Sequence, residues 1–347
     1  MHPSFRLPAV LLLAVTALVS ACTCTNKKEE PETTPDKVVV AYVTSWTDDI
    51  PDPELMTHIN YSFGHVSDSF NSVRIDNPDR LNKLVRLKKT CPGLNVMLSI
   101  GGWGSGRFSE MAADDNLRAS FAADCRRVVE MYGLDGIDID WEYPGDGEGA
   151  GISESPDDRG NFTLMMHDIR AAIGPDKWLT LASACTPMYI DFPSIMDCVD
   201  LVNIMAYDMS EGERLHSALY DSDLAPEWTT SKAVTAHLKA GVPANKLVVG
   251  IPFFGKGTKD YKGGRSFSNI YPVPASYKEC WDEKAMVPYL TDLDGKYVFG
   301  YENERSVTVK CDYILENGFG GAMYWDYHDN VPDCTLSKIL ASKILGR

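Results

Sequence analysis

Short apolar runs alternate along most of the chain with longer stretches whose apolar residues recur at helical spacing. The runs at 38–43, 94–100 and 246–252 are almost continuously apolar, a pattern that predicts strands covered on both faces. The complete set of eight predicted strands is 38–43, 58–63, 94–100, 134–140, 178–184, 199–206, 246–252 and 320–325.

The amphipathic stretches between these runs predict helices. The segment 109–132 is followed by Gly133, a residue favoured just beyond the end of a helix. The predicted helices are 78–89, 109–132, 159–173, a short turn at 194–198, 230–240, 306–317 and 336–345. Strands alternating with helices predict one α/β domain over 38–347, a (β/α)8 TIM barrel whose helices surround a closed parallel sheet.

One segment interrupts this alternation. Residues 258–304, between the seventh strand and its helix, are rich in Gly, Tyr and Pro and contain Trp281. The segment is too short for a large independent domain. We therefore expect an insertion of short irregular pieces that forms a wall on one side of the barrel mouth.

The densest group of acids lies in 134–144, at the end of the fourth predicted strand. Strand alternation places Asp138, Asp140 and Glu142 on one face. Three ionised carboxylates there would repel each other, so at least one is expected to hold a proton near neutrality, as general acid catalysis requires. A solvated surface would not carry the apolar residues between them. A calcium loop starting at Asp138 fails because its sixth position is Tyr143 rather than Gly.

Aromatic residues recur at the carboxyl ends of the other strands, where the active site of a TIM barrel lies. They include Tyr42, Trp46, Phe63, Trp103, Tyr207 and Trp325. Aromatic faces stack on sugar rings and carboxylates bind hydroxyl groups, so the combination indicates a carbohydrate cleft. The end of the seventh strand, 250–257, holds no acid, and Asp208 is the only obvious further carboxylate. A retaining hydrolase would then lack a clear protein nucleophile, and a 2-acetamido group of the substrate could replace it.

The motif Asp135-x-x-Asp138-x-Asp140-x-Glu142 resembles the signature of glycoside hydrolase family 18, the chitinase family. Three more motifs agree with that family in order and place, and the resemblance spans about 38–345; they are Ser99-x-Gly101-Gly102, Met205-x-Tyr207-Asp208 and Trp325. The resemblance implies retaining, substrate-assisted hydrolysis of β-1,4 bonds between N-acetylglucosamine units. It implies no cofactor, and no cysteine–histidine spacing in the chain is typical of a zinc site.

The same resemblance implies roles for individual residues. Glu142 would be the general acid and then the base, Asp140 the mobile residue that stabilises the charged intermediate, and Asp138 its inner proton partner. Tyr207 would orient the acetamido carbonyl. The other positions implied to bind substrate or support the acids are Tyr42, Phe63, Ser99, Trp103, Tyr143, Met205, Asp208 and Trp325. Asp135 and Gly136 would be structural.

Two other functions stay open. An endo-β-N-acetylglucosaminidase acting on N-glycans shares the acid motif, although Trp141 and Tyr143-Pro144 favour the chitinase type. A non-catalytic chitin-binding lectin usually lacks the terminal acid, whereas this chain retains Glu142. The insertion is shorter than that of many family members that act from chain ends, which suggests a shallower cleft and endo-acting cleavage.

The net charge and the N-terminal segment indicate which classes of molecule the protein binds and where it is located. The formal net charge of -16 argues against nucleic acid and anionic membrane surfaces and suits an uncharged sugar polymer. An apolar run at 9–19 is too short to span a bilayer and leads into Val19-Ser20-Ala21-Cys22, which resembles a bacterial lipoprotein signal. We expect a signal peptide at 1–21, a lipid on Cys22 and a disordered tether over 22–37.

An ordinary secretory signal cut after Ala21 is the alternative, and both signals place the protein outside the cytoplasm. The lipid-anchored form would sit on a membrane of the cell envelope. The chain has nine cysteines, and an oxidising compartment would allow disulfides to form.

Overall fold

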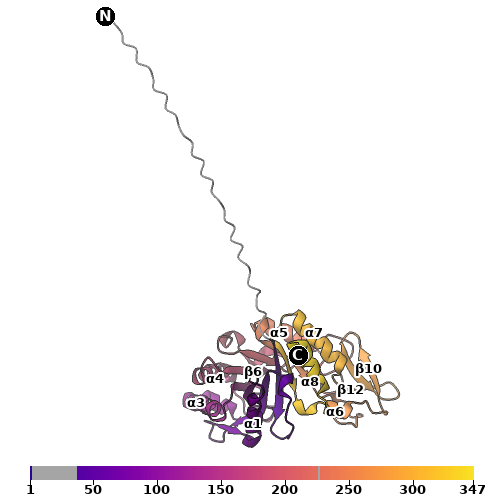
Figure 1. Ribbon diagram of the computed structural model, residues 1–347, viewed down its shortest axis with the longest axis horizontal. Coiled ribbons are helices and arrows are strands. Elements are labelled where there is room, and N and C mark those ends of the chain that lie inside the picture. Colours follow the sequence, from indigo (N-terminus) through magenta and orange to yellow (C-terminus); the bar gives the residue numbers. More distant parts are fainter. Residues whose placement is uncertain (2–36, 226) are drawn as a thin grey trace. The chain divides into compact units, whose positions relative to one another are not determined.

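A computed structural model describes residues 1, 37–225 and 227–347 (Figure 1). Apart from Met1 and Lys37, the predicted signal peptide and the predicted tether, which begins at Cys22, lie outside the described residues. Within the part that is described, no helix is long and apolar enough to cross a membrane.

Eight parallel strands close into a barrel, which confirms the predicted (β/α)8 TIM fold. The strands are β1 (Val38–Thr44), β2 (His58–Val66), β4 (Asn95–Gly101), β5 (Gly136–Asp140), β6 (Trp178–Ser183), β7 (Leu201–Ile204), β8 (Leu247–Pro252) and β13 (Gly321–Trp325). Closure comes from β1, which pairs with β13 on one side and with β2 on the other. A short ninth strand, β3 (Val73–Ile75), pairs antiparallel with the end of β2.

Alternation along β1 shows why the apolar runs are almost continuous. Val39, Ala41 and Val43 pack in the large hydrophobic cluster that includes residues of the outer helices. Val40 and Tyr42 belong to a smaller cluster inside the barrel, together with residues of β7, β8 and β13. Both faces of the strand are therefore buried. Tyr42, near the carboxyl end of β1, lies where the barrel interior borders the active-site face.

Helices follow most of the strands, and several of the predicted helices are divided in the structure. The helices are α1 (Pro78–Val85), α2 (Phe108–Ala113), α3 (Asp115–Tyr132), α4 (Asp158–Ile173), α5 (Thr230–Lys239), α6 (Phe267–Ile270), α7 (Glu304–Glu316) and α8 (Thr335–Leu340). Short 3-10 or π turns complete the set: η1 (Pro53–Leu55), η2 (Arg86–Lys89), η3 (Pro187–Tyr189), η4 (Phe192–Ser194), η5 (Ala244–Lys246), η6 (Tyr327–Asp329) and η7 (Ala341–Leu345).

The single helix predicted at 109–132 is wrong, because α2 and α3 are separate. The side chain of Asp114 caps α3 by accepting hydrogen bonds from the backbone N–H groups of Asn116 and Leu117. The strands β1 and β6 are followed only by 3-10 turns. The turn predicted at 194–198 lies slightly upstream as η4, in which Pro193 occupies the first turn.

The insertion after β8 is more regular than predicted. It forms a four-stranded antiparallel sheet in the order β10-β11-β12-β9, so the expectation of irregular pieces was wrong. Its strands are β9 (Lys256–Gly257), β10 (Lys278–Asp282), β11 (Val287–Thr291) and β12 (Tyr297–Gly300). In Figure 1, β10 and β12 lie on the side of the barrel unit away from α3 and α4.

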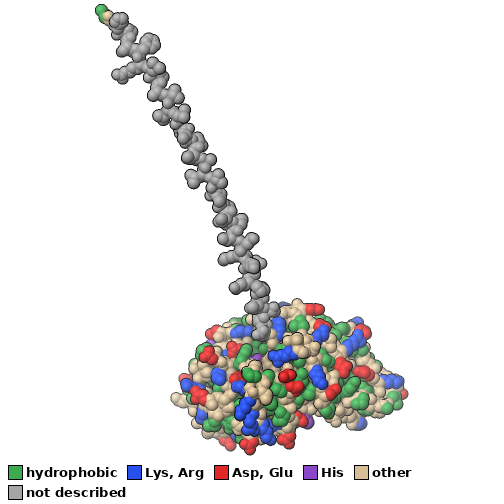
Figure 2. All heavy atoms as spheres, in the orientation of Figure 1, with side chains coloured by type: hydrophobic (Ala, Val, Ile, Leu, Met, Phe, Trp, Pro, Cys, Tyr) green, Lys and Arg blue, Asp and Glu red, His purple; other side chains and the backbone are tan. Residues whose placement is uncertain are grey.

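Charge and cysteines complete the description. Figure 2 shows acidic and basic side chains interspersed over the visible face, so the acidic excess is spread there rather than gathered in one place.

All seven cysteines in the described ranges are free thiols, and three of them, Cys125, Cys198 and Cys311, are buried. These three behave as small apolar side chains in the packing.

Candidate active site

A cleft of about 510 Å³ opens at the carboxyl ends of the barrel strands. Ten of the predicted site residues line it: Tyr42, Phe63, Trp103, Asp140, Glu142, Tyr143, Met205, Tyr207, Asp208 and Trp325. The two other members of the predicted set, Asp138 and Ser99, are fully buried and do not line the cleft. The fold therefore brings together residues from six different strands or strand ends at one mouth.

Asp138 occupies a polar position inside the barrel, where four side chains donate hydrogen bonds to it. Tyr42 and Ser99 donate to Oδ2 over 2.9 and 2.8 Å. Thr180 and Asn203 donate to Oδ1 over 2.5 and 3.3 Å. Burial raises the pKa of Asp138, and these four hydrogen bonds oppose that shift by stabilising the carboxylate.

Asp140 is buried two residues further along β5, yet its surroundings differ. Its Oδ1 atom is inaccessible and has no hydrogen-bond partner among the described residues. Burial raises the pKa of Asp140 well above its usual range, and the charges of Glu142 and Asp138 raise it further. A buried carboxyl oxygen without a partner is unfavourable, and a turn of the Asp140 side chain toward the cleft would let this oxygen accept a hydrogen bond from a bound ligand.

Glu142 lies just beyond the end of β5 and is half-buried in the cleft. Burial raises its pKa to about 7; the hydroxyl of Tyr143 opposes the shift, and the charge of Asp208 adds to it. A carboxyl group with this pKa carries a proton in a large fraction of molecules near neutrality. It can therefore donate that proton and take one back, as a general acid and base must.

Asp208 faces the same cleft but stays ionised. Its Oδ1 atom lies 3.1 Å from Nζ of Lys256 on β9 and 3.7 Å from Nδ1 of the buried His216. Burial opposes ionisation, but these two neighbours outweigh it and lower the pKa of Asp208. Two carboxyl groups at one site, Glu142 and Asp208, thus have pKa values shifted in opposite directions.

Aromatic side chains form one wall of the cleft. The rings of Phe63 and Trp325 are stacked, with centroids 5.6 Å apart and planes inclined by 20°. Tyr42 and Trp46 lie against Trp325 at 5.7 and 6.4 Å. The stacked pair presents an apolar surface of the kind on which a sugar ring packs.

A second aromatic group lies at the side of the cleft formed by the β4 and β5 ends. Tyr143 stacks on Tyr189 at 4.8 Å with planes inclined by 8°. Trp103 meets Tyr143 edge-on at 6.4 Å and is 64% exposed. Together the three rings form a contiguous aromatic surface beside the cleft, a feature typical of ligand-binding grooves.

Several residues of this site were absent from the sequence prediction. Thr180 and Asn203 support Asp138, Lys256 and His216 flank Asp208, and Tyr189 extends the aromatic side. Strand alternation could have pointed to Thr180 and Asn203 as inward-facing polar residues on predicted strands. Tyr189 lies in η3, His216 in a loop and Lys256 in the short strand β9, where no periodic signal marks an orientation.

Known proteins resemble the chain in sequence and in fold. Residues 38–330 match the family model described as Glycosyl hydrolases family 18. The chain is 32% identical to chitinase A1 of Niallia circulans over 351 residues, which cover 88% of this chain and 48% of that protein. It is 30% identical to the endochitinase of Manduca sexta over 353 residues, which cover 83% of this chain and 62% of that protein.

The chain thus spans about half the length of the first relative and less than two thirds of the second. A solved structure of a glycoside hydrolase family 18 N-acetylglucosaminidase from Paenibacillus barengoltzii has a TM-score of 0.81 and 32% identity, covering 89% of this chain and 100% of that one. The match over 38–330, together with the closed barrel, shows that the chain belongs to glycoside hydrolase family 18.

Proposed function

We propose that this protein is a chitinase that hydrolyses β-1,4 bonds between N-acetylglucosamine units in chitin or chito-oligosaccharides. The observation that carries the proposal is the position of Glu142. Its carboxyl group, with a pKa of about 7, lies in an aromatic-walled cleft next to the buried, unpartnered Oδ1 atom of Asp140. Those features suit acid catalysis on a sugar that carries a hydrogen-bond donor.

The proposed reaction begins with the proton on Glu142, which passes to the glycosidic oxygen as the bond to the anomeric carbon breaks. The acetamido carbonyl oxygen of the same sugar attacks that carbon and forms an oxazolinium ion. Asp140, as a carboxylate, accepts a hydrogen bond from the acetamido N–H and offsets the positive charge. Tyr207 donates its hydroxyl hydrogen to the acetamido oxygen and orients it for attack.

Water completes the reaction. Glu142, now a carboxylate, takes a proton from a water molecule that attacks the anomeric carbon, and the oxazolinium ring opens to restore the acetamido group. Two displacements at one carbon retain its configuration. As Asp140 becomes a carboxylate, its proton would pass to Asp138. Burial raises the pKa of Asp138 and favours this transfer, whereas the four hydrogen bonds to its carboxylate oppose it.

The charge state of Asp208 supports a nucleophile supplied by the substrate. Lys256, 3.1 Å away, engages the carboxylate of Asp208, and the end of β8 at 250–257 provides no other acid. A thiazoline analogue of the oxazolinium ion is therefore expected to inhibit strongly. Indifference to that analogue would instead favour a protein nucleophile such as Asp208.

A second candidate is the removal of single N-acetylglucosamine units, because the Paenibacillus barengoltzii protein of similar fold is described as an N-acetylglucosaminidase. Product analysis separates the candidates. Chitohexaose should yield di-, tri- and tetrasaccharides early in the reaction of an endo-acting chitinase, whereas an exo-acting enzyme releases monosaccharide from the start. Cleavage of an N-glycopeptide but not of chitohexaose would favour an endo-β-N-acetylglucosaminidase, and binding without any product would favour a lectin.

We also propose that the protein is an extracytoplasmic lipoprotein. Support comes from the small residues before Cys22 and the short apolar run that precedes them. Replacement of Cys22 by Ala should move the protein from the membrane fraction to the soluble fraction. Continued partitioning of the Cys22→Ala protein with membranes would contradict the anchor.

A further inference from the structure

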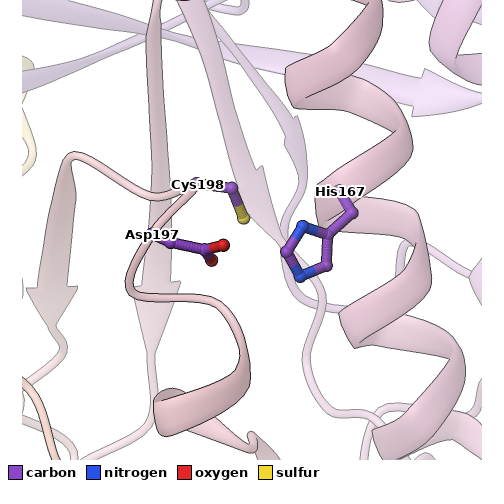
Figure 3. Close-up of side chains that lie close together, drawn as sticks. All are labelled: His167, Asp197 and Cys198. Carbon is purple, nitrogen blue, oxygen red and sulfur yellow. The ribbon is translucent and has the colours of Figure 1, made fainter.

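Three potential metal ligands lie together outside the cleft. They are His167 on α4 and the consecutive Asp197 and Cys198, which follow η4, and their ligand atoms all lie within 4.8 Å of one another. Figure 3 shows the His167 ring facing the Asp197 carboxylate and the Cys198 sulfur. None of the three lines the active-site cleft.

A hydrogen bond prepares the histidine for coordination. Nε2 of His167 lies 2.8 Å from the carbonyl oxygen of Ser194, which can only accept, so Nε2 carries the ring proton. With the proton on Nε2, Nδ1 is the nitrogen that can offer its lone pair to an ion. Metal-binding histidines commonly show this arrangement, in which one ring nitrogen donates to a carbonyl while the other binds the ion.

The segment that carries the other two ligands is fixed from both sides. Nζ of Lys246 donates to the carbonyl oxygens of Met196 and Val199 over 2.7 and 2.5 Å. Nε of Arg170 donates to the carbonyl oxygen of Cys198 over 2.8 Å. These contacts hold the backbone on either side of Asp197 and Cys198, so little ordering would accompany ligand binding.

The positive charges of Lys246 and Arg170 oppose the approach of a metal ion. Asp200 partly neutralises Arg170, since Oδ2 of Asp200 lies 2.5 Å from Nη2 of Arg170. Asp197 contributes one negative charge and Cys198 contributes a second once it loses its proton. The carboxylate and the thiolate together can therefore balance the charge of a divalent ion in spite of the neighbouring cations.

The same trio does not suit nucleophilic catalysis. Burial raises the pKa of Cys198 to about 11, so its thiol stays protonated near neutrality and now donates to the carbonyl oxygen of Ile195 over 3.3 Å. A bound metal ion can displace that proton, because metal binding to cysteine is coupled to deprotonation. Ligand atoms around a tetrahedral zinc ion lie roughly 3.5 Å apart, so small side-chain movements would complete the site.

We propose that His167, Asp197 and Cys198 bind one divalent ion of the zinc class, with water in the fourth position. A nitrogen, an oxygen and a sulfur ligand favour a borderline metal such as Zn²⁺ over Ca²⁺ or Mg²⁺, which prefer oxygen ligands alone. The ion would join α4 to the segment after η4 and so stabilise the fold without taking part in the reaction. No motif reveals this site because His167 precedes Asp197 by thirty residues.

Metal binding to the purified full-length protein tests the proposal. After treatment with EDTA and removal of the chelator, Zn²⁺ is titrated against a chromogenic competitor, and Co²⁺ is added separately to record its spectrum. We expect one ion per chain, a thiolate-to-cobalt absorption band, and a rise in Tm of roughly 3–8 °C at saturating Zn²⁺. Ca²⁺ and Mg²⁺ should produce none of these effects.

Two variants identify the ligands. His167→Gln retains an N–H group that can reach the Ser194 carbonyl but removes the Nδ1 ligand, and Cys198→Ala removes the thiol. Both should lose the Zn²⁺-dependent rise in Tm, and Cys198→Ala should also lose the cobalt band. His167→Gln lies on a partly exposed helix face and should fold normally, so it stays informative if Cys198→Ala does not fold.

Matched controls are His328→Gln, on an exposed histidine paired with Asp49, and Cys91→Ala, on a half-buried free cysteine. Both should bind Zn²⁺ as the unchanged protein does. Absence of zinc binding at micromolar concentration, or equal binding by His167→Gln and His328→Gln, would overturn the proposal. Chitin hydrolysis by His167→Gln should be unchanged, so this result is independent of the proposed activity.

Discussion

Asp138 and Asp140 are buried two residues apart on β5, yet only Asp138 is held by hydrogen bonds. Four side chains donate to Asp138, whereas the Oδ1 atom of Asp140 has no partner among the described residues. The carboxylate held by four donors thus lies two residues before one whose Oδ1 atom has no partner in the described part of the chain. In the proposed mechanism this difference leaves Asp140 free to accept a hydrogen bond from the substrate. Asp138 stays in place and takes up the proton that Asp140 loses.

The shortest of the four contacts provides a test of this relationship. Thr180→Val removes the hydroxyl that donates to Oδ1 of Asp138 over 2.5 Å and preserves the shape of the side chain. The pKa of Asp138 should rise because its carboxylate loses a donor, and kcat should fall by roughly tenfold with little change in KM. Thr163→Val, on the exposed face of α4, is the control, and an unchanged kcat in Thr180→Val would contradict the prediction.

Glu142→Gln should abolish the proton transfer while leaving the shape of the cleft intact. We expect kcat to fall by roughly 10²- to 10⁴-fold, with binding of chito-oligosaccharides measured by calorimetry close to that of the unchanged protein. Glu148→Gln alters an exposed acid of the same loop and should hydrolyse normally. Near-normal turnover by Glu142→Gln would show that Glu142 is not the general acid.

The pH dependence of hydrolysis follows from the pKa of Glu142. The general acid must be protonated in the free enzyme, so kcat/KM should fall as the pH rises above about 7. The charge of Asp208 contributes to this raised pKa. Asp208→Asn removes that charge, which should lower the pKa of Glu142 and move the alkaline limb of the profile to lower pH. A limb that stays in place, or that moves to higher pH, would contradict the prediction that the charge of Asp208 raises the pKa of Glu142.

The exposed Trp103 allows binding and stability to be separated. Trp103→Ala removes a stacking surface worth about 0.5–1.5 kcal/mol, so KM for chito-oligosaccharides should rise by roughly 2- to 10-fold. The free energy of unfolding should change by less than about 0.5 kcal/mol, because the side chain is 64% exposed. Trp281→Ala changes a tryptophan of the insertion that does not line the cleft, and its KM should equal that of the unchanged protein.

A buried ion pair ties the insertion boundary to α7. Nζ of Lys310 lies 2.5 Å from Oε1 of Glu302, and both side chains are completely buried. Lys310→Met would leave the Glu302 carboxylate unpaired, which should lower the free energy of unfolding by about 3–5 kcal/mol. Adding Glu302→Gln should restore part of that loss, since no buried charge then remains.

The measurement for this pair is urea denaturation of the single and double variants. Lys343→Met breaks the exposed pair with Asp312 and should cost less than about 1 kcal/mol. If the double variant were no more stable than Lys310→Met, the unpaired charge would not be the cause of the loss.

Much of the fold could be predicted because it depends on local patterns. Continuous apolar runs indicate strands that are buried on both faces, and helical spacing between these runs indicates the outer layer of helices. The eight barrel strands were therefore predicted close to their observed bounds. The errors came where the local signal was weak. Asp114 divides two helices that share one amphipathic pattern, and the insertion is a sheet whose strands are too short to show clear alternation.

The sequence by itself determined which residues meet at the barrel mouth, because in a closed parallel sheet every strand end faces the same side. Only the tertiary structure decided what each of them contacts. The four donors to Asp138 come from β1, β4, β6 and β7, and His167 meets Cys198 between α4 and a loop. Such contacts depend on the register between neighbouring strands and on which side chains meet across the interior. Neither can be predicted from the spacing of residues along one segment.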